Sequence, residues 1–260
     1  MADGGAMFGT VPKRAWQRKY QSDENNLCPL AMRCVLAISD TRRIVTDTGM
    51  GDKHLDKISY YQPHKLTHIK KAVEDLGYSC EEITDVILTH LHFDHCGGAT
   101  IRDINGNINP TFPHARYWLS KKQWENSLAP NRLEADSIFE NSIHPILDTG
   151  ILHLIEEDTQ IDNNCYMRLF DGHSEGQIVA YFNTEDGIYT FPGDLIPTAA
   201  HVPLEWISAY DISAVTAIKE KERFLTDAVQ NRHSLIYCHD NMTQVSRIIK
   251  LNDNYKAEKK

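Results

Sequence analysis

One ten-residue segment constrains this chain more than any other feature of its sequence. Residues 89–98 read Thr-His-Leu-His-Phe-Asp-His-Cys-Gly-Gly and directly follow the strand-like run Val86-Ile87-Leu88. In an extended backbone, side chains two residues apart point the same way, so His90 and His92 can present two imidazoles to one metal ion. The segment therefore predicts a strand that ends in a metal-binding turn.

The second half of this segment extends the prediction to a second ion. Asp94 and His95 come after the chain has begun to turn, so we expect them to face another metal beside the first. Gly97 and Gly98 then allow a sharp bend toward a helix start, because glycine carries no Cβ. Chance would produce this His-x-His-x-Asp-His pattern in roughly a few chains per thousand of this composition.

Further ligand candidates occur downstream where strand patterns end or turn. His173 lies in the glycine-flanked turn 171–176, Asp194 follows the run Ile188 to Phe191, and His239 follows Ser234 to Cys238. Each alone would be a weak signal. Together with the first segment they make five histidines and two aspartates, a nitrogen and oxygen set that suits paired borderline divalent ions.

Apolar, β-branched runs alternate with turn signals along the chain, which favours many short strands. They are residues 34–38, 43–47, 85–89, 116–119, 151–155, 166–170, 177–182, 188–191 and 234–238. Helical patterns cover 64–76 and about 212–229, and a third stretch, 121–146, is interrupted at Pro130. Two sheets packed face to face with helices outside is the architecture that this alternation favours. We see no repeat or linker, so residues 1–260 are expected to form a single domain.

Composition and charge exclude several classes of protein. The formal net charge is −9, which disfavours a nucleic-acid partner, and no window reaches the 18 apolar residues of a membrane span. The N-terminus has no basic segment followed by an apolar one, so we expect a cytoplasmic protein. The six cysteines contain no Cys-x-x-Cys pair and are expected to be reduced, and Lys256 to Lys260 should form a solvated tail.

The order Asp47, His90-x-His92-x-Asp94-His95, His173, Asp194 and His239 resembles the five-motif signature of the metallo-β-lactamase superfamily. This resemblance extends over most of the chain and implies an α+β, four-layer αββα sandwich with two mixed sheets. It also implies two divalent ions per chain, for which zinc is the expected metal. His90, His92 and His173 would bind one ion, and Asp94, His95 and His239 the other. Asp194 would bridge them, and Asp47 would orient the ligand loops.

At two ligand positions this sequence differs from particular branches of the superfamily, and these differences narrow the expected activity. Class B β-lactamases generally have cysteine where Asp194 stands, and the diiron flavoproteins usually have glutamate in place of His92. The remaining group is the dinuclear hydrolases with a bridging aspartate. Gly193 to Ile196, Gly5 to Gly9 and Phe112 to Tyr117 are most similar to N-acyl-homoserine lactonases and methyl-parathion-type hydrolases.

The function implied by this resemblance is lactone hydrolysis by a metal-bridging hydroxide, with an N-acyl-homoserine lactone as the preferred substrate and quorum quenching as the role. Asp94 would orient the hydroxide and pass its proton to the leaving oxygen. A phosphotriester, or a thioester as in glyoxalase II, is the alternative substrate at the same site. A metal-binding regulatory protein is the alternative from outside the enzymes.

Several residues are candidates for substrate contact, although packing is the commoner role for residues of each of these types. These are Met7, Phe8, Phe93, Ile196, His201, Trp206 and Tyr210, the last as a donor to a developing oxyanion. The expected partner is a small lactone or ester, with neither nucleic acid nor membrane. A homodimer is also expected, since the apolar segment Phe8 to Val11 could meet a second subunit.

Overall fold

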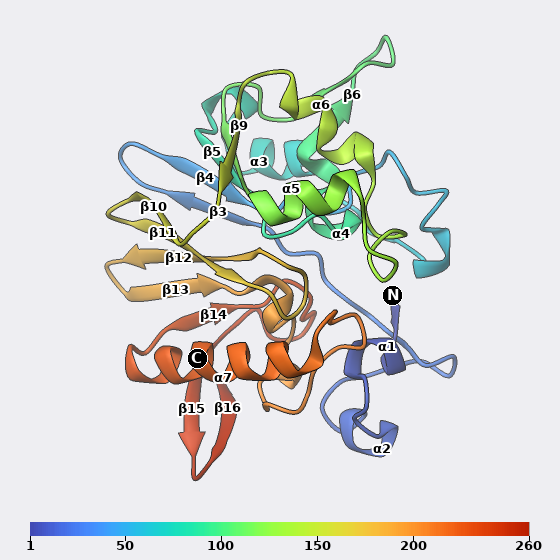
Figure 1. Ribbon diagram of the computed structural model, residues 1–260, viewed down its shortest axis with the longest axis vertical. Coiled ribbons are helices and arrows are strands. Elements are labelled where there is room, and N and C mark those ends of the chain that lie inside the picture. Colours follow the sequence, from blue (N-terminus) through green and yellow to red (C-terminus); the bar gives the residue numbers. More distant parts are fainter. Residues whose placement is uncertain (260) are drawn as a thin grey trace. The chain divides into compact units, whose positions relative to one another are not determined.

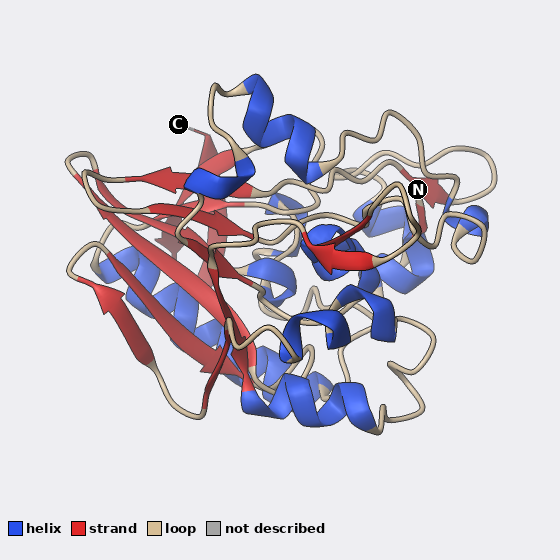
Figure 2. Ribbon diagram, turned by 90° about the horizontal axis from the view of Figure 1, so that it is seen from above, coloured by secondary structure: helices blue, strands red, loops and turns tan. Residues whose placement is uncertain are grey.

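The computed structural model describes residues 1–259 and contains two compact units. We call Met32–Glu157 the central unit, and Met1–Ala31 with Asp158–Lys260 the terminal unit. Each contains one mixed sheet with helices, so the prediction of two mixed sheets is confirmed (Figures 1 and 2). The single domain over 1–260 stays a prediction. Among the described residues, no helix is both long and apolar enough to cross a bilayer.

The central unit has a five-stranded sheet in the order β3-β4-β5-β8-β9 (Figure 1). Its strands are β3 (Val35–Ile38), β4 (Arg43–Thr46), β5 (Asp85–Ile87), β8 (Arg116–Ser120) and β9 (Leu152–Ile155). The first pair is antiparallel and the others are parallel. Parallel neighbours need a crossover connection, and these connections contain the helices and the metal-binding segment. A separate hairpin pairs β6 (Thr100–Arg102) with β7 (Ile108–Pro110).

The helices of the central unit are short and cover the hydrophobic side chains of its sheet. They are α3 (Ile69–Asp75), α4 (Phe93–Cys96), α5 (Lys121–Leu128) and α6 (His144–Leu147), with 3-10 turns η1 (Ser59–Tyr61), η2 (Cys80–Glu82), η3 (Gly97–Ala99) and η4 (Glu140–Ser142). Ile69 and Val73 of α3 pack with Val86 of β5 in one buried cluster. The side chain of His68 accepts a hydrogen bond from the Lys70 amide, so α3 begins later than the pattern from residue 64 predicts. As expected, Pro130 divides the third helical stretch.

The terminal unit has a seven-stranded sheet in the order β10 to β16. Its strands are β10 (Thr159–Asp162), β11 (Cys165–Phe170), β12 (Gln177–Thr184), β13 (Gly187–Phe191), β14 (Ser234–Ile236), β15 (Val245–Leu251) and β16 (Asn254–Lys259). Only β13 and β14 are parallel; the other neighbours are antiparallel. The long helix α7 (Ala214–Gln230) lies between β13 and β14 in the chain and buries Phe224, Leu225 and Ala228 against the sheet.

The remaining elements of the terminal unit are short. They are α1 (Gly4–Phe8), α2 (Lys13–Trp16), η5 (Gly193–Leu195), η6 (Ala199–His201) and the strand pair β1 (Ala2–Asp3) and β2 (Leu27–Cys28). The rings of Trp16 and His201 stack on Phe8 with centroid separations of 5.0 and 4.7 Å. The N-terminal segment is therefore packed into this unit through aromatic contacts.

The predicted C-terminal tail is wrong for residues 256–259, and residue 260 lies outside the described residues. Lys256 and Glu258 have exposed side chains as expected, but their backbone belongs to β16, which pairs with β15. The reason is Tyr255, which is buried in the core and whose hydroxyl lies 2.7 Å from the Thr226 hydroxyl on α7. One buried aromatic residue therefore holds a strand that also contains the charged residues Lys256 and Glu258.

Candidate metal centre

The metal-binding segment of the central unit lies at the carboxyl ends of two parallel strands. Asp47 directly follows β4, and His90 follows β5. Parallel neighbours end at the same edge of a sheet, and the Asp47 amide donates to the Ile87 carbonyl at 2.9 Å. The side chains of His90, His92, Asp94 and His95, which we call the first ligand group, start from this edge.

Asp47 orients two of these side chains, and it is almost fully buried. Its Oδ2 accepts a hydrogen bond from His95 Nδ1 at 2.7 Å and another from the Thr89 hydroxyl at 2.8 Å. Thr89 Oγ1 in turn lies 3.0 Å from His90 Nδ1. Since the Thr89 proton goes to Asp47, that contact is donated by His90 Nδ1. Both histidines are therefore held as tautomers with a lone pair on Nε2, the form that binds a metal ion.

His90 and His92 face each other as two ligands of one ion would. His90 Nε2 lies 3.1 Å from His92 Nδ1, and their ring planes are 80° apart. Two nitrogens that share a tetrahedral zinc with bonds of about 2.0 to 2.1 Å are about 3.3 Å apart. The other nitrogen of His92, Nε2, is 3.0 Å from a carboxylate oxygen of Glu134. A carboxylate accepts, so His92 Nε2 carries the proton and Nδ1 is the metal-facing atom.

Asp94 and His95 occupy the first turn of α4, beside the histidine pair. His95 Nε2 lies 3.9 Å from Asp94 Oδ2, and the His95 ring centroid lies 4.1 Å from that of His90. The Asp94 side chain is 23% exposed, whereas that of His95 is almost fully buried. The central unit thus brings together all four members of the first ligand group, as the sequence predicts.

The terminal unit brings together His173, Asp194 and His239, which we call the second ligand group. Asp194 follows β13 and His239 follows β14, so these two residues also lie at the carboxyl ends of parallel neighbours. His173 lies in the turn between β11 and β12, and β12 is antiparallel to β13. The start of β12 therefore lies at the edge of the sheet where β13 ends.

Asp194 presents one carboxylate oxygen to each histidine of this group. Oδ1 lies 3.1 Å from His239 Nε2, and Oδ2 lies 3.5 Å from His173 Nε2. Both distances are close to the roughly 3.3 Å expected between ligands of one tetrahedral zinc. Two oxygens directed at two different imidazoles is the arrangement expected of a carboxylate that bridges two ions.

In each of these two imidazoles, the Nδ1 atom donates a hydrogen bond to an oxygen of the terminal unit. His173 Nδ1 donates to Asp211 Oδ1 at 2.8 Å, and His239 Nδ1 donates to the Ala31 carbonyl at 2.9 Å. When neutral, both rings therefore have a lone pair on Nε2 directed at the Asp194 carboxylate, and that contact is repulsive unless a cation lies between them. The residues present consequently fit divalent metal ions.

The electrostatics of His239 agree with this requirement for positive charge. Burial acts to lower the pKa of His239, but the neighbouring Asp194 carboxylate acts to raise it, and that pKa lies well above its usual value. Cys238 itself donates from Sγ to Asp194 Oδ1 at 3.2 Å, and burial raises the pKa of this thiol to about 12. Cys238 is therefore a neutral donor to Asp194 at neutral pH, in keeping with a structural role.

Backbone contacts hold the turn that carries His173. Glu220 on α7 accepts hydrogen bonds from the amides of Asp171 and Gly172. A Cβ at Gly172 would lie only 2.4 Å from the Cα of Ala217, so this close approach to α7 requires glycine. Helix α7 thereby fixes the position of a predicted ligand whose own sequence context is only a short turn.

Three of the candidate substrate contacts are buried in the terminal unit near its N-terminal segment. Met7 and Phe8 lie in α1, where the Met7 carbonyl accepts from His201 Nε2 at 2.7 Å. The Thr198 hydroxyl contacts the other His201 nitrogen at 2.7 Å, and burial lowers the His201 pKa to about 3. His201 is therefore a neutral imidazole whose two nitrogens are both used within the fold. Trp206 also packs here, edge-on to Phe8.

The other candidate substrate contacts are divided between the two units. Ile196 is buried in the core of the terminal unit, and Phe93 packs in a cluster of the central unit with Ile58 and Phe139. Tyr210 is 39% exposed and directly precedes Asp211, the acceptor for His173. Phe93 lies between His92 and Asp94 of the first ligand group in the chain. Substrate contact by any member stays a prediction.

Glu134 and Asp211 are the orienting residues that the sequence did not reveal. Glu134 is buried, and its second oxygen accepts from the side-chain amides of Asn126 and Asn131. Both carboxylates lie in irregular segments, and in the sequence they are distant from the histidines that they contact. Their only sequence signal is a single acidic residue within a loop, which is too common to identify a partner.

A family model described as the metallo-beta-lactamase superfamily matches residues 32–155. No curated protein matches the chain. Among solved structures, a protein from Staphylococcus aureus described as a probable metal-dependent hydrolase is similar, with 27% identity and a TM-score of 0.87. That match covers 94% of this chain and 87% of the other.

Two further solved structures are similar at lower identity. AidC, described as a dizinc quorum-quenching lactonase in complex with a product, has 19% identity and a TM-score of 0.72 over 89% of this chain and 80% of its own. A mutant of AiiA from B. thuringiensis, with N-decanoyl-L-homoserine bound, has 19% identity and a TM-score of 0.72, covering 93% and 89%. At such identity the likeness shows the fold. The chain has the metallo-β-lactamase fold, and with its histidine-rich ligand groups it is a metal-dependent hydrolase whose residues 32–155 are similar to the metallo-β-lactamase superfamily.

Proposed function

We propose that the two ligand groups together bind two divalent ions, expected to be zinc, and that the enzyme opens lactones. In this proposal His90, His92 and His173 hold one ion. Asp94, His95 and His239 hold the other, and Asp194 bridges the two. The assignment rests on the order of the ligands in the sequence, together with the metal-facing atom that each unit exposes on each histidine.

The observation that carries the proposal is the geometry around Asp194. Its two oxygens face Nε2 of His173 and Nε2 of His239 at 3.5 and 3.1 Å. A structural zinc site is closed by four ligands, commonly with several cysteines, whereas nitrogen and oxygen ligands shared over two ions leave positions for water. A bridging carboxylate therefore favours a catalytic site over a structural one.

When bound, a pair of divalent ions supplies a nucleophile at neutral pH and polarises the carbonyl group that is attacked. The residues of the chain orient the ligands and transfer the proton. Asp47 and Glu134 hold His95 and His92 in their metal-binding tautomers. The Asp94 side chain is 23% exposed, against 15% for Asp194, and a carboxylate has two oxygens. One can serve as a ligand while the other carries a proton to the leaving oxygen of the lactone.

A lactone is the proposed substrate because the fold is similar to that of AidC, described as a lactonase and holding a product, and to that of AiiA with N-decanoyl-L-homoserine bound. Opening a lactone breaks the bond between the carbonyl carbon and the ring oxygen, which stays attached to the product as an alkoxide. Asp94 would take the proton of the attacking hydroxide and pass it to this alkoxide. An N-acyl-homoserine lactone is the substrate to test first. With that substrate, the proposed role is quorum quenching.

The experiment is a substrate panel with metal-loaded enzyme. An N-acyl-homoserine lactone is followed by proton release, beside a phosphotriester and a glutathione thioester. We expect the lactone to have the highest kcat/KM, and expect His92→Ala to abolish turnover while circular dichroism remains unchanged. His153→Ala, in the same unit but on β9, is the matched control. Preference for either other substrate would overturn the lactonase proposal, and full activity of His92→Ala would overturn the metal site.

A further inference from the structure

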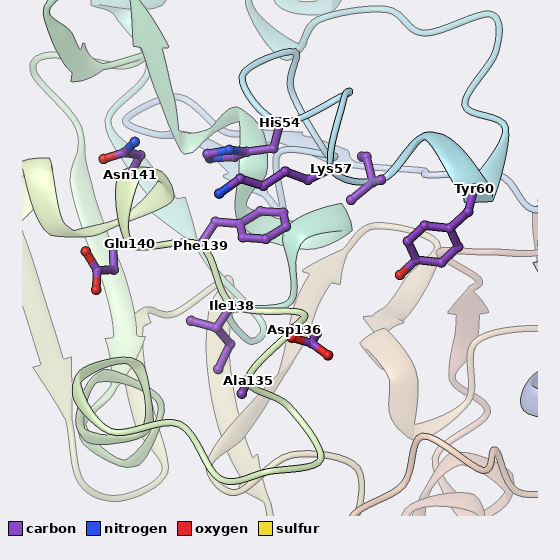
Figure 3. Close-up of a pocket in the computed structure, with 10 residues that line it drawn as sticks. His54, Lys57, Tyr60, Ala135, Asp136, Ile138, Phe139, Glu140 and Asn141 are labelled. Carbon is purple, nitrogen blue, oxygen red and sulfur yellow. The ribbon is translucent and has the colours of Figure 1, made fainter.

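The second ligand group has a support that its own strands do not provide. In the central unit, Glu134 holds His92 and directly precedes residues 135–141, which line a cavity of about 580 Å³ (Figure 3). In the terminal unit, the N-terminal segment Met1–Ala31, drawn in blue in Figure 1, contacts the loops around the second ligand group. None of the predicted ligands comes from this segment, so these contacts need a separate explanation.

The end of the N-terminal segment is hydrogen-bonded to His239 through both its backbone and its ring. The Ala31 amide donates to the His239 carbonyl at 3.0 Å, and the Ala31 carbonyl accepts from His239 Nδ1 at 2.9 Å. The buried Tyr20 hydroxyl lies 3.2 Å from the same His239 carbonyl and 2.8 Å from the Pro29 carbonyl. It also lies 3.2 Å from Asn241 Oδ1. One phenol therefore joins the segment to the loop that carries His239.

The beginning of the N-terminal segment is connected to His173 through Asp211. The Ala6 carbonyl of α1 accepts from the Ser208 hydroxyl at 3.1 Å and from the Ala209 amide at 2.8 Å. Ser208 in turn donates its amide to Asp211 Oδ2 at 3.2 Å. The other oxygen of this carboxylate, Oδ1, accepts from His173 Nδ1 at 2.8 Å. Since each link is a direct hydrogen bond, α1 helps to fix the acceptor that orients His173.

Aromatic packing joins these two connections into one unit of structure. The Phe8 ring of α1 lies 5.0 Å from the Trp16 ring and 5.9 Å from the Tyr20 ring, measured between centroids. All three side chains are at most 3% exposed. The element that contacts Ser208 and the residue that contacts the His239 carbonyl are therefore held in a single cluster. A ligand that is already held in place loses less conformational entropy when an ion binds, so such packing favours metal binding.

We propose that the N-terminal segment positions the second ligand group, with Tyr20 as the positioning residue for His239 and Ser208 as the link between α1 and His173. The inference rests on the proposed binding of metal ions by this group, and it does not depend on the substrate. Tyr20 acts through the backbone of His239, and Ser208 acts through Asp211. Because such coupling is reciprocal, an ion that binds the two histidines also stabilises the packing of the N-terminal segment.

The first measurement follows the two Nδ1 protons by NMR in metal-free, ¹⁵N-histidine-labelled protein. Tyr20→Phe keeps the ring that packs near Phe8, and it should speed solvent exchange of the His239 Nδ1 proton while that of His173 is unchanged. Ser208→Ala should have the opposite selectivity. Tyr166→Phe on β11 and Ser22→Ala in the N-terminal segment are the matched controls and should change neither proton. Faster exchange of both protons in both variants would indicate general loosening, and that result, or no change in either variant, would overturn the proposal.

Zinc binding provides the second measurement. In chelator competition, Tyr20→Phe and Ser208→Ala should each bind one zinc ion about 2- to 10-fold more weakly, the loss expected from one hydrogen bond. Unchanged affinity in both variants would overturn the positioning role.

Hydrogen exchange of the wild-type chain, followed by mass spectrometry, needs no variant. Zinc should slow exchange of the amides in residues 4–9 and 27–31, because binding and packing of the segment are coupled. Zinc that binds without slowing exchange there would overturn the positioning role. Selective exchange of the two Nδ1 protons in a protein that binds no zinc would retain the positioning role and overturn the proposed metal site.

Discussion

Replacing Asp47 with asparagine tests how one buried carboxylate controls a metal-binding histidine. The φ angle of Asp47 is +55°, in the left-handed region that asparagine also tolerates, so Asp47→Asn preserves the backbone. The retained oxygen can still accept from the Thr89 amide. The new NH₂ group takes the place of Oδ2, which accepts from His95 Nδ1 at 2.7 Å in the native protein.

The consequence for metal binding follows from proton positions. An NH₂ group facing His95 Nδ1 requires that this nitrogen accept, so the proton of His95 moves to Nε2 and blocks the metal-facing atom. Loss of an orienting partner of a ligating histidine typically weakens metal affinity by about 10- to 100-fold, or about 1.4 to 2.7 kcal/mol. We therefore expect Asp47→Asn to lower the affinity for one of the two ions by this amount.

The assay is competition for zinc with a chromophoric chelator, which resolves two binding steps. Asp52→Asn, an exposed aspartate of the same segment, is the matched control and should bind as the wild type does. Thermal unfolding of the metal-free proteins separates metal affinity from stability. If both zinc affinities were unchanged in Asp47→Asn, the reasoning from the His95 tautomer would be refuted.

Three further predictions concern other parts of the fold. Lys221 is buried, with Nζ donating to three backbone carbonyls, and burial lowers its pKa to about 7. The unfolded chain therefore binds more protons than the native protein between about pH 7 and 10, so urea unfolding should show stability rising over this range in the wild type but not in Lys221→Met. Gly172→Ala should lower the free energy of unfolding by about 1 to 3 kcal/mol, because its Cβ would collide with Ala217. Glu134→Gln should weaken zinc binding through His92 by about 10-fold or more in chelator competition.

Each of these predictions has a contradicting outcome. Parallel stability curves for wild type and Lys221→Met would mean that Lys221 is not the titrating group. Wild-type stability of Gly172→Ala would show that the turn carrying His173 moves away from α7 at little cost. Unchanged zinc affinity in Glu134→Gln would mean that Glu134 does not set the His92 tautomer.

Local pattern was enough to predict much of the fold. Runs such as 116–119 and 177–182 are rich in aromatic or β-branched residues, and they correspond to β8 and β12. The hairpin of β15 and β16 was missed because its residues are mostly charged or polar. Its stability comes from pairing and from one buried residue, Tyr255, neither of which produces a periodic signal. Tertiary contact here overrides local composition.

The candidate site also contains residues that the sequence predicts and residues that it does not. The spacing of His90, His92, Asp94 and His95 follows from strand and turn geometry, so these residues could be found from the sequence. Asp211 and Glu134 could not, because only the folded loops bring them to their histidines. Orienting contacts of this kind depend on long-range packing, and a single sequence carries no record of it.

Metal content of the intact chain tests the central claim most directly. Protein reconstituted with zinc, passed through a desalting column and measured by mass spectrometry of the metal should contain close to two ions per chain. Asp194→Ala should retain fewer than one, because the residue that joins the two coordination spheres is lost. A single tightly held ion in the wild type, or two ions still bound in Asp194→Ala, would contradict the account.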